Sequence, residues 1–530
     1  MSSAQGKTRA ESAPTRAATG SSLAGSVLFI TIFSVASPFI TFFIQVVVAA
    51  YFGATELMDA FLAGVTLPLY VVAVVLSSAV SVFIPLFIGK LAVNQEKAAW
   101  QLAASVLSFT LLLTSALALT CIVFAEPLLR MTTPGLAGEA MRAAVSVARI
   151  TWVSVPAAAL TAFLTGMYQA RGRFIWSSAV PAIGTVVNLV LLPFLIPLAG
   201  ISGVAASATI ALILQMLLLL PVLRDRVSGF SFSFFDPGLV EVLRLSYPMV
   251  LFGILSKCTP IVERHLASGM EQGSISHLGY AFRLLTTSAF LISTGITTVA
   301  FPRMALQSAL TDIKALWKTI SGSFRMMFLV VAPATTLGLA LALPLVSALF
   351  ERGKFTATDS FAVCGLLRIY LLTLVATTLG NISCRAFYAI KDTSTLAIFG
   401  AIETVAYVLY TAFLASRFGV SGIAWGYVVY FSVSFIWQTA ILWFRFGRGE
   451  VRGFRPFGVT AACALAAGLA AWFVKGLLPG AWLQLGGGIA AGALVYIAAL
   501  KLLKSEDLEL FLKYTLRRRP STAEADANLV

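Results

Sequence analysis

The chain consists mostly of apolar runs that are each about as long as a lipid bilayer is thick. A helix needs roughly 20 apolar residues to cross the hydrocarbon core. Of the 530 residues, 59% are hydrophobic and only 11% are charged, whereas soluble domains carry about 25% charged residues. A soluble fold of this composition would lack the polar side chains to cover its surface. We therefore expect an all-α polytopic membrane protein.

The length and spacing of the apolar runs predict about fourteen transmembrane helices. They are expected at residues 24–51, 59–90, 96–125, 140–169, 174–199, 201–223, 239–267, 276–305, 314–350, 359–389, 394–416, 420–444, 456–478 and 481–503. Several runs are longer than the bilayer requires, which indicates tilted or extended helices. Residues 1–22 are polar and basic and lack the apolar core of a signal peptide, so we interpret them as a disordered tail.

Basic residues gather in every second connection between these runs. They include Lys90 and Lys97, Arg171 and Arg173, Arg224 and Arg226, Arg303 and Lys314, Arg385 and Lys391, Arg445 to Arg455, and the tail 505–530. The intervening connections are poorer in them, although 351–359 is a mild exception. The positive-inside rule then places both termini in the cytoplasm. The net charge of +15 reflects this topology, and no nucleic-acid partner is expected.

The chain offers little for metal or disulfide chemistry. Its five cysteines all fall inside apolar runs, and its two histidines, His265 and His277, lie at the end of a run. Neither set has the spacing of a disulfide framework or a metal site. We expect no metal, no cofactor and no catalytic residue, and we expect that the protein is not an enzyme.

The sequence repeats itself once. GISGVA at 200–205 returns 219 residues later as GVSGIA at 419–424, and the same offset relates Arg149 to Arg368. Runs one to six therefore match runs seven to twelve, and both copies enter the membrane in the same direction. Two lobes related by a parallel repeat are typical of transporters with a central site. We expect an N-lobe at 23–226, a C-lobe at 227–450 and two extra helices within 451–504.

A charge inside a membrane helix is costly, by about 2.5–3.5 kcal/mol at the bilayer centre, so each one needs an explanation. The charges are Arg149, Lys257, Glu263, Arg264, Arg283, Arg368 and Glu403. The planar guanidinium of Arg283 suits an anionic, phosphate-bearing substrate. Alternatively, Glu263 pairs with Arg283 or with Arg264 and only fixes packing.

The other intramembrane charges have weaker interpretations. Arg149 and Arg368 are equivalent in the repeat, which favours a structural role within each lobe, such as bonding backbone carbonyls near a helix end. We place Asp59 in the same structural class. Glu403 stands alone in an apolar run, so it is either a proton or cation site or a structural hydrogen-bonding group.

Several stretches together resemble the lipid II flippase family (MurJ/MviN) of the multidrug/oligosaccharidyl-lipid/polysaccharide exporter superfamily. They are FGATELMDAF (52–61), LP (67–68), ARIT to ARGRF (148–174), Asn188, YAFRL (280–284), FERGKFTATD (350–359) and LRIY to CRAFYAIKDTST (367–395). The resemblance covers residues 24–503. It implies fourteen helices, two lobes and a cationic central cavity in the bacterial cytoplasmic (inner) membrane, where undecaprenyl-pyrophosphate-linked sugars are flipped by alternating access.

The resemblance also assigns site residues. Arg283 falls on the family's cavity arginine, and Glu263 falls on an acidic position linked to cation binding in some members. Where the family usually has an arginine–aspartate pair in the first helix, this chain has Ile44 and Gln45. The second helix, LPLYVVAVVLSSAV (67–80), lacks the usual paired arginines and acid–glycine pair. In the eleventh helix, Tyr407 and Thr411 occupy positions where some members have cation ligands.

These departures leave the cargo open. The substrate-binding residues are expected to be Arg283, Lys257, Gln45 and Tyr280, with Glu263 and Glu403 as cation or coupling residues. The cargo is lipid II or, as the missing charges favour, an exopolysaccharide or other cell-surface repeat unit. The coupling is expected to use Na⁺, H⁺ or the membrane potential, and the protein is expected to be a monomer.

Three other functions are compatible with fewer features. A cation-coupled exporter of small amphiphiles, similar to multidrug exporters of the superfamily, would need acids in the first six helices, which have almost none beyond Asp59. A polyprenyl-linked glycan ligase or polymerase would need a large external loop for its catalytic residues, and the external loops are short. A scaffold without transport is the third alternative.

Overall fold

The computed structural model describes residues 20–224, 237–447, 455–505 and 507–508, which contain helices and connections but no β-strand. The helices are α1 (Gly20–Phe52), α2 (Glu56–Ala92), α3 (Glu96–Val123), α4 (Ala125–Thr132), α5 (Gly138–Ala170), α6 (Phe174–Ala199), α7 (Ile201–Leu219), α8 (Pro237–Ser256), α9 (Thr259–Ser268), α10 (Ser274–Ala309), α11 (Ile313–Ala340), α12 (Ala342–Phe350), α13 (Ala357–Leu371), α14 (Thr373–Ala389), α15 (Thr393–Leu442), α16 (Arg455–Leu477) and α17 (Ala481–Leu502). Short η1 (Leu220–Leu223) and η2 (Trp443–Gly447) follow α7 and α15. The predicted all-α membrane fold is confirmed.

Among these described residues, eleven helices are long and apolar enough to cross a membrane, or twelve if α13 and α14, bent by 41°, form one span. Two elements explain most of the difference from fourteen. The segment Thr393–Gly447 is counted as one span although Gly419 interrupts α15 within it, and the apolar part Ala36–Phe52 of α1 is classed as a shorter helix. The predicted number of about fourteen is therefore close to the observed one.

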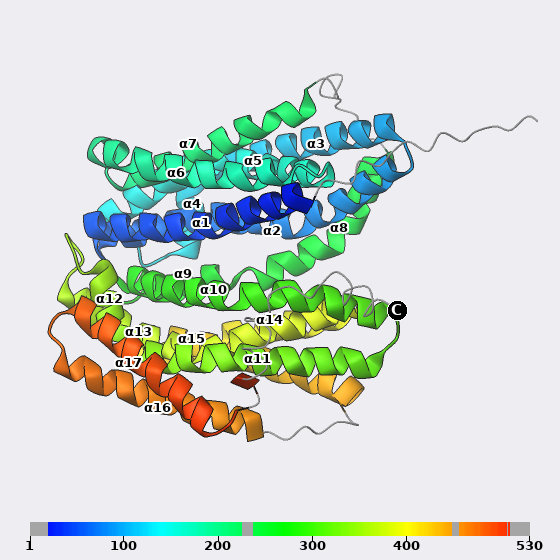
Figure 1. The fold of residues 1–530 in the computed structure, drawn as a ribbon. Coiled ribbons are helices and arrows are strands. Elements are labelled where there is room, and N and C mark those ends of the chain that lie inside the picture. Colours follow the sequence, from blue (N-terminus) through cyan, green and yellow to red (C-terminus); the bar gives the residue numbers. More distant parts are fainter. Residues whose placement is uncertain (1–19, 225–236, 448–454, 506, 509–530) are drawn as a thin grey trace, which may run out of the picture.

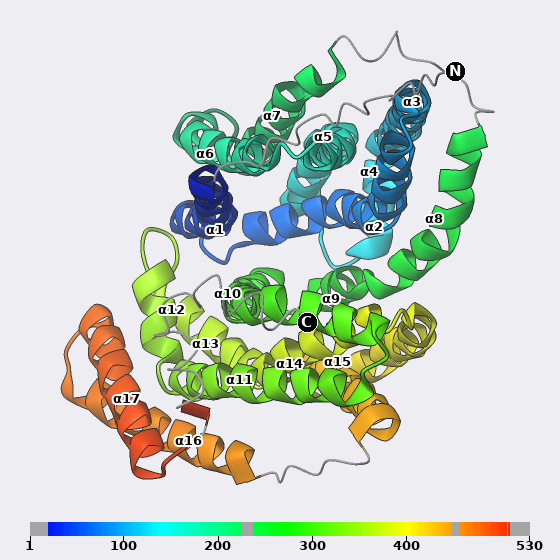
Figure 2. The same ribbon diagram turned by 45° about the vertical axis from the view of Figure 1, so that its right-hand side comes forward.

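The helices form two groups in space. Figures 1 and 2 show α1–α7 on one side and α9–α15 on the other, with α8 running between them and α16–α17 on the outer side of the second group. The predicted lobe limits at 226, 227 and 450 lie outside the described residues, as does most of both predicted tails. Those limits stay a prediction.

The buried core shows where the two groups meet. One cluster contains residues of both groups, including Ile44 and Phe52 of α1 and Tyr280 and Phe350 of α10 and α12. At the opposite end of the helices the cores are separate. One is built around Phe83 and α3, with a contribution from α8, and the other around Met304 and α11. The groups are thus packed together at the end that carries the α1–α2 and α12–α13 connections.

The internal repeat appears in the backbone itself. Gly200, between α6 and α7, has φ 55° and ψ −132°, and Gly419 inside α15 has φ 58° and ψ −138°. Residues other than glycine rarely adopt this conformation. Three residues later, a Cβ on Gly203 or Gly422 would lie 2.2 or 2.1 Å from a backbone oxygen. The matching GISGVA and GVSGIA stretches therefore make the same tight helix-to-helix turn.

Proline interrupts two of the predicted spans. The run 239–267 is divided into α8 and α9 at Lys257, just before Pro260 in the first turn of α9. The run 314–350 is divided at Leu341, between α11 and α12, where Pro344 cannot donate to the carbonyl of Ala340. Proline lacks the N–H that would continue the helix. The ammonium of Lys475 on α16 donates to that freed carbonyl instead, at 2.9 Å.

Candidate functional site

The two helix groups are joined by the contacts of residues 50–59 with residues 273–280 and 353–355. We call these contacts the outer closure, because the charge pattern of the sequence predicts that this end faces outward. Its central group is the buried carboxylate of Asp59 on α2. The backbone N–H groups of Gly273 and Ser276 donate to Asp59 at 2.8 and 2.7 Å, and the Ser276 hydroxyl donates as well. The three donors belong to the amino-terminal turn of α10, where a negative charge is favourable.

Asp59 was expected to be a structural residue of its lobe, and its hydrogen bonds here are structural but link its lobe to the other group of helices. Its three donors all belong to the other group of helices. The sequence could not show this, because an acid in the first turn of α2 is equally suited to cap its own helix. The carboxylate instead accepts from the amide of Gly273, the N-cap of α10, which lies 214 residues later in the sequence.

Close backbone approach completes the closure. The Lys354 N–H donates to the Ala50 carbonyl at 2.9 Å, and the Tyr280 hydroxyl donates to the Gly53 carbonyl at 2.9 Å. A Cβ on Gly53 would lie 2.5 Å from the Lys354 oxygen, and one on Gly353 would lie 2.1 Å from the Ala50 oxygen. Both glycines also have positive φ, at 63° and 62°. Only glycine lets the two backbones come this close.

Tyr280 was expected to bind substrate, but in this conformation its side chain belongs to the closure. It is 1% exposed, and its ring packs against Phe350 and Phe355 with centroids 5.2 and 5.3 Å away. The closure therefore brings together three of the stretches that carried the family resemblance: FGATELMDAF, YAFRL and FERGKFTATD. Gly53, Gly353 and Asp59 were the available signals for this contact.

Arg283 lies one turn after Tyr280 on α10 and is half-buried. Its guanidinium makes no hydrogen bond or ion pair with any described residue, and the partner of Glu263 is Arg264 instead. Lys257, exposed at the α8–α9 break, and Gln45, half-buried on α1, are likewise without such contacts in the described part of the chain. Arg283 is thus a charge inside a membrane helix without an internal counter-ion, and such residues are functional-site candidates by default.

Glu263 on α9 is buried and paired within its own helix. The Arg264 guanidinium lies 3.4 Å from one carboxylate oxygen, and the Tyr407 hydroxyl donates to the other at 3.3 Å. The Glu263–Arg264 alternative is therefore the observed pair. Thr411 follows one turn after Tyr407, and its buried hydroxyl has no partner. Because Arg264 already supplies a positive charge, the Glu263 carboxylate gains less from a second cation than an unpaired carboxylate would.

No ion pair joins Glu403 on α15 to a cationic side chain of the described residues. The Trp437 indole N–H donates to one of its oxygens at 3.2 Å, while the other oxygen is buried without a hydrogen-bond partner. No group of three or more histidine, cysteine, aspartate or glutamate residues in the described ranges could hold a metal ion. A buried carboxyl with one donor and no counter-ion is suited to carry a proton.

The repeat-related arginines differ in their contacts. The Arg149 Nε donates to the Ile122 carbonyl near the end of α3, at 3.3 Å, as a structural role would require. Arg368 is exposed and makes no hydrogen bond or ion pair with the described residues. In the second group the corresponding helix end is bonded by Lys475 from α16. The symmetric role predicted for Arg368 therefore has no contact to support it, since a residue from outside the repeat supplies the cation.

A family model described as "Lipid II flippase MurJ" matches residues 48–485 of this chain. The chain belongs to the lipid II flippase MurJ family. It is therefore a multi-pass protein of the bacterial inner membrane. A relative named "Probable lipid II flippase MurJ" from Thermotoga maritima is 24% identical over 88% of this chain and 94% of its own length. A relative of the same name from Bdellovibrio bacteriovorus is 27% identical over 61% of this chain and 63% of its own length, slightly less than two thirds.

The fold agrees with the MurJ family. A solved structure titled "Lipid II flippase MurJ, inward closed conformation" has a TM-score of 0.76 at 21% identity and covers 90% of this chain and 98% of that one. An inward-facing multidrug resistance MATE family transporter of the MOP superfamily has a TM-score of 0.66 at 18% identity, covering 79% of this chain and 96% of its own. The predicted place of the MurJ family within this superfamily fits both likenesses.

Proposed function

We propose that this chain flips an undecaprenyl-pyrophosphate-linked glycan from the cytoplasmic to the outer leaflet by alternating access. Membership of the MurJ family supports a lipid-linked glycan as the cargo and supports transport over catalysis. The observation that carries the proposal is Arg283, an intramembrane guanidinium with no internal counter-ion. In a dry site such a group binds a pyrophosphate through charge-assisted hydrogen bonds.

The arrangement of the cores supports the direction of transport. The groups are sealed at the outer closure and have separate cores at the other end, where the connections predicted to be cytoplasmic lie. In this state the headgroup enters from the cytoplasm and meets Arg283 while the lipid tail stays in the bilayer. Neutralisation of Arg283 then lets the inner ends approach and the outer closure open. Both termini are cytoplasmic in this scheme, and the protein works as a monomer.

The headgroup has two candidates. The relatives are named for lipid II, which favours that cargo. Helix α1 carries no charged residue, and α2 carries none between Asp59 and Lys90, so the first group has fewer charges to hold a carboxylate-rich headgroup. This second observation favours a cell-surface polysaccharide unit, held by Arg283 together with Lys257 and Gln45.

Glu403 is the better coupling residue in this scheme. Its carboxyl has one donor and no cation, whereas Glu263 is already neutralised by Arg264. Protonation of Glu403 removes a buried charge, which links the cycle to H⁺. The membrane potential contributes as well, at about 2.3 kcal/mol per charge per 100 mV.

Complementation tests the proposal. The chain is expressed in cells depleted of their own lipid II flippase, and growth is scored for the parent and for Arg283→Ala, Arg283→Lys and, as a control, the exposed Arg417→Ala. Lipid II transport predicts rescue by the parent and the control, none by Arg283→Ala, and partial rescue by Arg283→Lys. Equal rescue by Arg283→Ala would contradict the assignment of Arg283 as a substrate-binding residue. No rescue, with protein present in the membrane, would favour the surface-polysaccharide cargo.

A further inference from the structure

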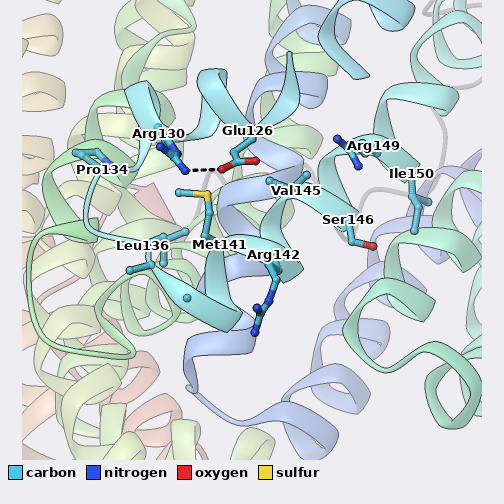
Figure 3. Close-up of a pocket in the computed structure, with 12 residues that line it drawn as sticks. Glu126, Arg130, Pro134, Leu136, Met141, Arg142, Val145, Ser146, Arg149 and Ile150 are labelled. Atoms are coloured by element: carbon cyan, nitrogen blue, oxygen red, sulfur yellow. Dashed lines mark hydrogen bonds and ion pairs between the residues drawn. The ribbon is translucent and has the colours of Figure 1, made fainter. Parts of the chain in front are cut away.

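A pocket of about 770 Å³ lies in the first helix group, between α4 and the start of α5. Figure 3 shows it with three arginines on its walls, Arg130, Arg142 and Arg149, and one acid, Glu126. It is separate from Arg283, which belongs to the other group. Leu136 and Met141 give it an apolar side.

The pocket carries unbalanced positive charge. Arg130 pairs with Glu126 at 2.6 Å, so these two charges cancel. Arg149 uses its Nε to bond the Ile122 carbonyl, and its terminal N–H groups have no partner in the described part of the chain. Arg142 is exposed and makes no hydrogen bond or ion pair with the described residues. Two arginines that line the pocket therefore have no carboxylate partner among the described residues.

The two arginines are arranged along one helix face. Arg142, Ser146 and Arg149 follow the i, i+4, i+7 pattern on α5, which places Arg149 about 10 Å further along the axis than Arg142. Helix α5 starts at Gly138 with no side-chain cap, so its first N–H groups also point toward this end. Arg149 then lies about 16 Å from the start of the helix. At that depth an exposed cation is costly unless an anion accompanies it.

The position of these arginines contradicts the charge pattern elsewhere. The α3–α5 connection lies at the end predicted to face outward, opposite Lys90, Lys97, Arg171 and Arg173. The positive-inside rule disfavours basic residues at that end. The same connection touches the second helix group, through Met131 beside His265 at 3.2 Å and Gly135 beside Ser268 at 3.3 Å. The pocket therefore borders the contact between the groups.

We propose that this pocket binds the phosphate of a lipid headgroup in the outer leaflet. Arg142 and Arg149 hold the phosphate oxygens by charge-assisted hydrogen bonds, and the apolar side receives the first part of the lipid chain. Two lipids offer this chemistry: a polyprenyl pyrophosphate, such as a flipped product, and an anionic phospholipid. The inference does not depend on which cargo the central site transports.

The experiment measures lipid binding to the full chain in detergent by native mass spectrometry. All variants carry Arg283→Ala, so that the central arginine does not contribute. Arg142→Gln/Arg149→Gln is compared with its parent, with Arg142→Lys/Arg149→Lys, and with the exposed Arg417→Gln as a matched control. The probes are farnesyl pyrophosphate, dioleoyl phosphatidylglycerol, dioleoyl phosphatidylcholine and inorganic pyrophosphate. Thermal unfolding of each variant checks that it is folded.

We expect the glutamine pair to lose about tenfold or more in affinity for an anionic lipid probe, because two charge-assisted contacts disappear. The lysine pair should retain part of the binding, and Arg417→Gln all of it. A loss confined to farnesyl pyrophosphate identifies the flipped product as ligand, and a loss confined to phosphatidylglycerol identifies a phospholipid. Three results would overturn the proposal. The glutamine pair could bind lipid as well as the control does, the parent could bind no lipid, or inorganic pyrophosphate could be the only probe that binds.

Discussion

Asp59 shows how one side chain can hold two halves of a transporter together. It is buried where the groups meet, and it receives one hydroxyl and two backbone N–H donors from α10. Hydrogen bonds to a charged group contribute about 1.5–3 kcal/mol each. The acid is therefore a main determinant of whether the outer closure stays shut, although it never needs to touch the substrate.

Replacing Asp59 by asparagine is expected to open the outer closure. The amide keeps the shape but loses the charge and one acceptor oxygen. The reporter is Ser274→Cys, buried in the closed state, labelled from outside by a membrane-impermeant maleimide. Loss of about 1.5–3 kcal/mol should raise the labelling rate by roughly ten- to a hundredfold. Glu56→Gln, exposed in the same first turn of α2, should leave the rate unchanged, and an unchanged rate for Asp59→Asn would contradict the assigned role.

Single residues were the hardest feature to predict from the sequence. Arg283, Glu263 and Glu403 stood out because charges are rare in apolar runs. Their partners were less predictable. The Glu263–Arg264 pair was one of two predicted alternatives, whereas the contacts of Tyr280 depend on how distant helices pack. Likewise, the repeat suggested the same role for Arg149 and Arg368, but Lys475 lies outside the repeat and takes the corresponding carbonyl.

Helices were predicted more reliably than residues, because the length of an apolar run is itself the physical requirement for crossing a bilayer. The interruptions were not predicted. Breaks at Lys257 and Leu341 divide two of the expected spans. Proline creates the break, but whether a membrane helix tolerates it depends on another group to satisfy the freed carbonyl.

The paired turns at Gly203 and Gly422 give a prediction at this scale. Alanine in place of an exposed helical glycine normally stabilises by about 1 kcal/mol. At Gly422 the new Cβ would lie 2.1 Å from the Leu414 backbone oxygen, so the helices must separate. We expect Gly422→Ala and Gly203→Ala each to lower the melting temperature of the chain in detergent. Gly365→Ala, where α13 has open space, should raise it slightly, and the same sign at all three positions would refute the packing argument.

At the scale of the whole molecule, the two helix groups contact each other at the outer closure and have separate cores at the other end. This arrangement favours a rocking motion of one group against the other. Opening one end of two rigid groups closes the other, because each group keeps its own core. The outer closure is polar at its centre, where Asp59 binds α10, whereas the cores of the two groups at the other end are apolar. Under the proposed alternating access, we expect the closure to open while each group moves as a rigid body.

Paired distance measurements would detect this motion. Spin labels are placed at Lys97 and Lys314 for the inner end and at Glu56 and Thr358 for the outer end, all exposed positions, in a variant whose five cysteines are replaced by serine. Addition of a lipid-linked pyrophosphate substrate should shorten the inner distance and lengthen the outer one. Arg283→Ala should abolish both changes. Two distances that move in the same direction would exclude rocking.

The outer closure is held largely by main-chain atoms: the amides of Gly273, Ser276 and Lys354 and the carbonyls of Ala50 and Gly53. Every residue except proline offers an amide, and all offer a carbonyl. Neutral drift can therefore change most side chains of these connections without weakening the outer closure. The closure tolerates little change only at Gly53, Gly353 and Asp59. A sequence that has diverged widely from this chain can therefore keep the same outer closure, provided that it keeps Gly53, Gly353 and Asp59.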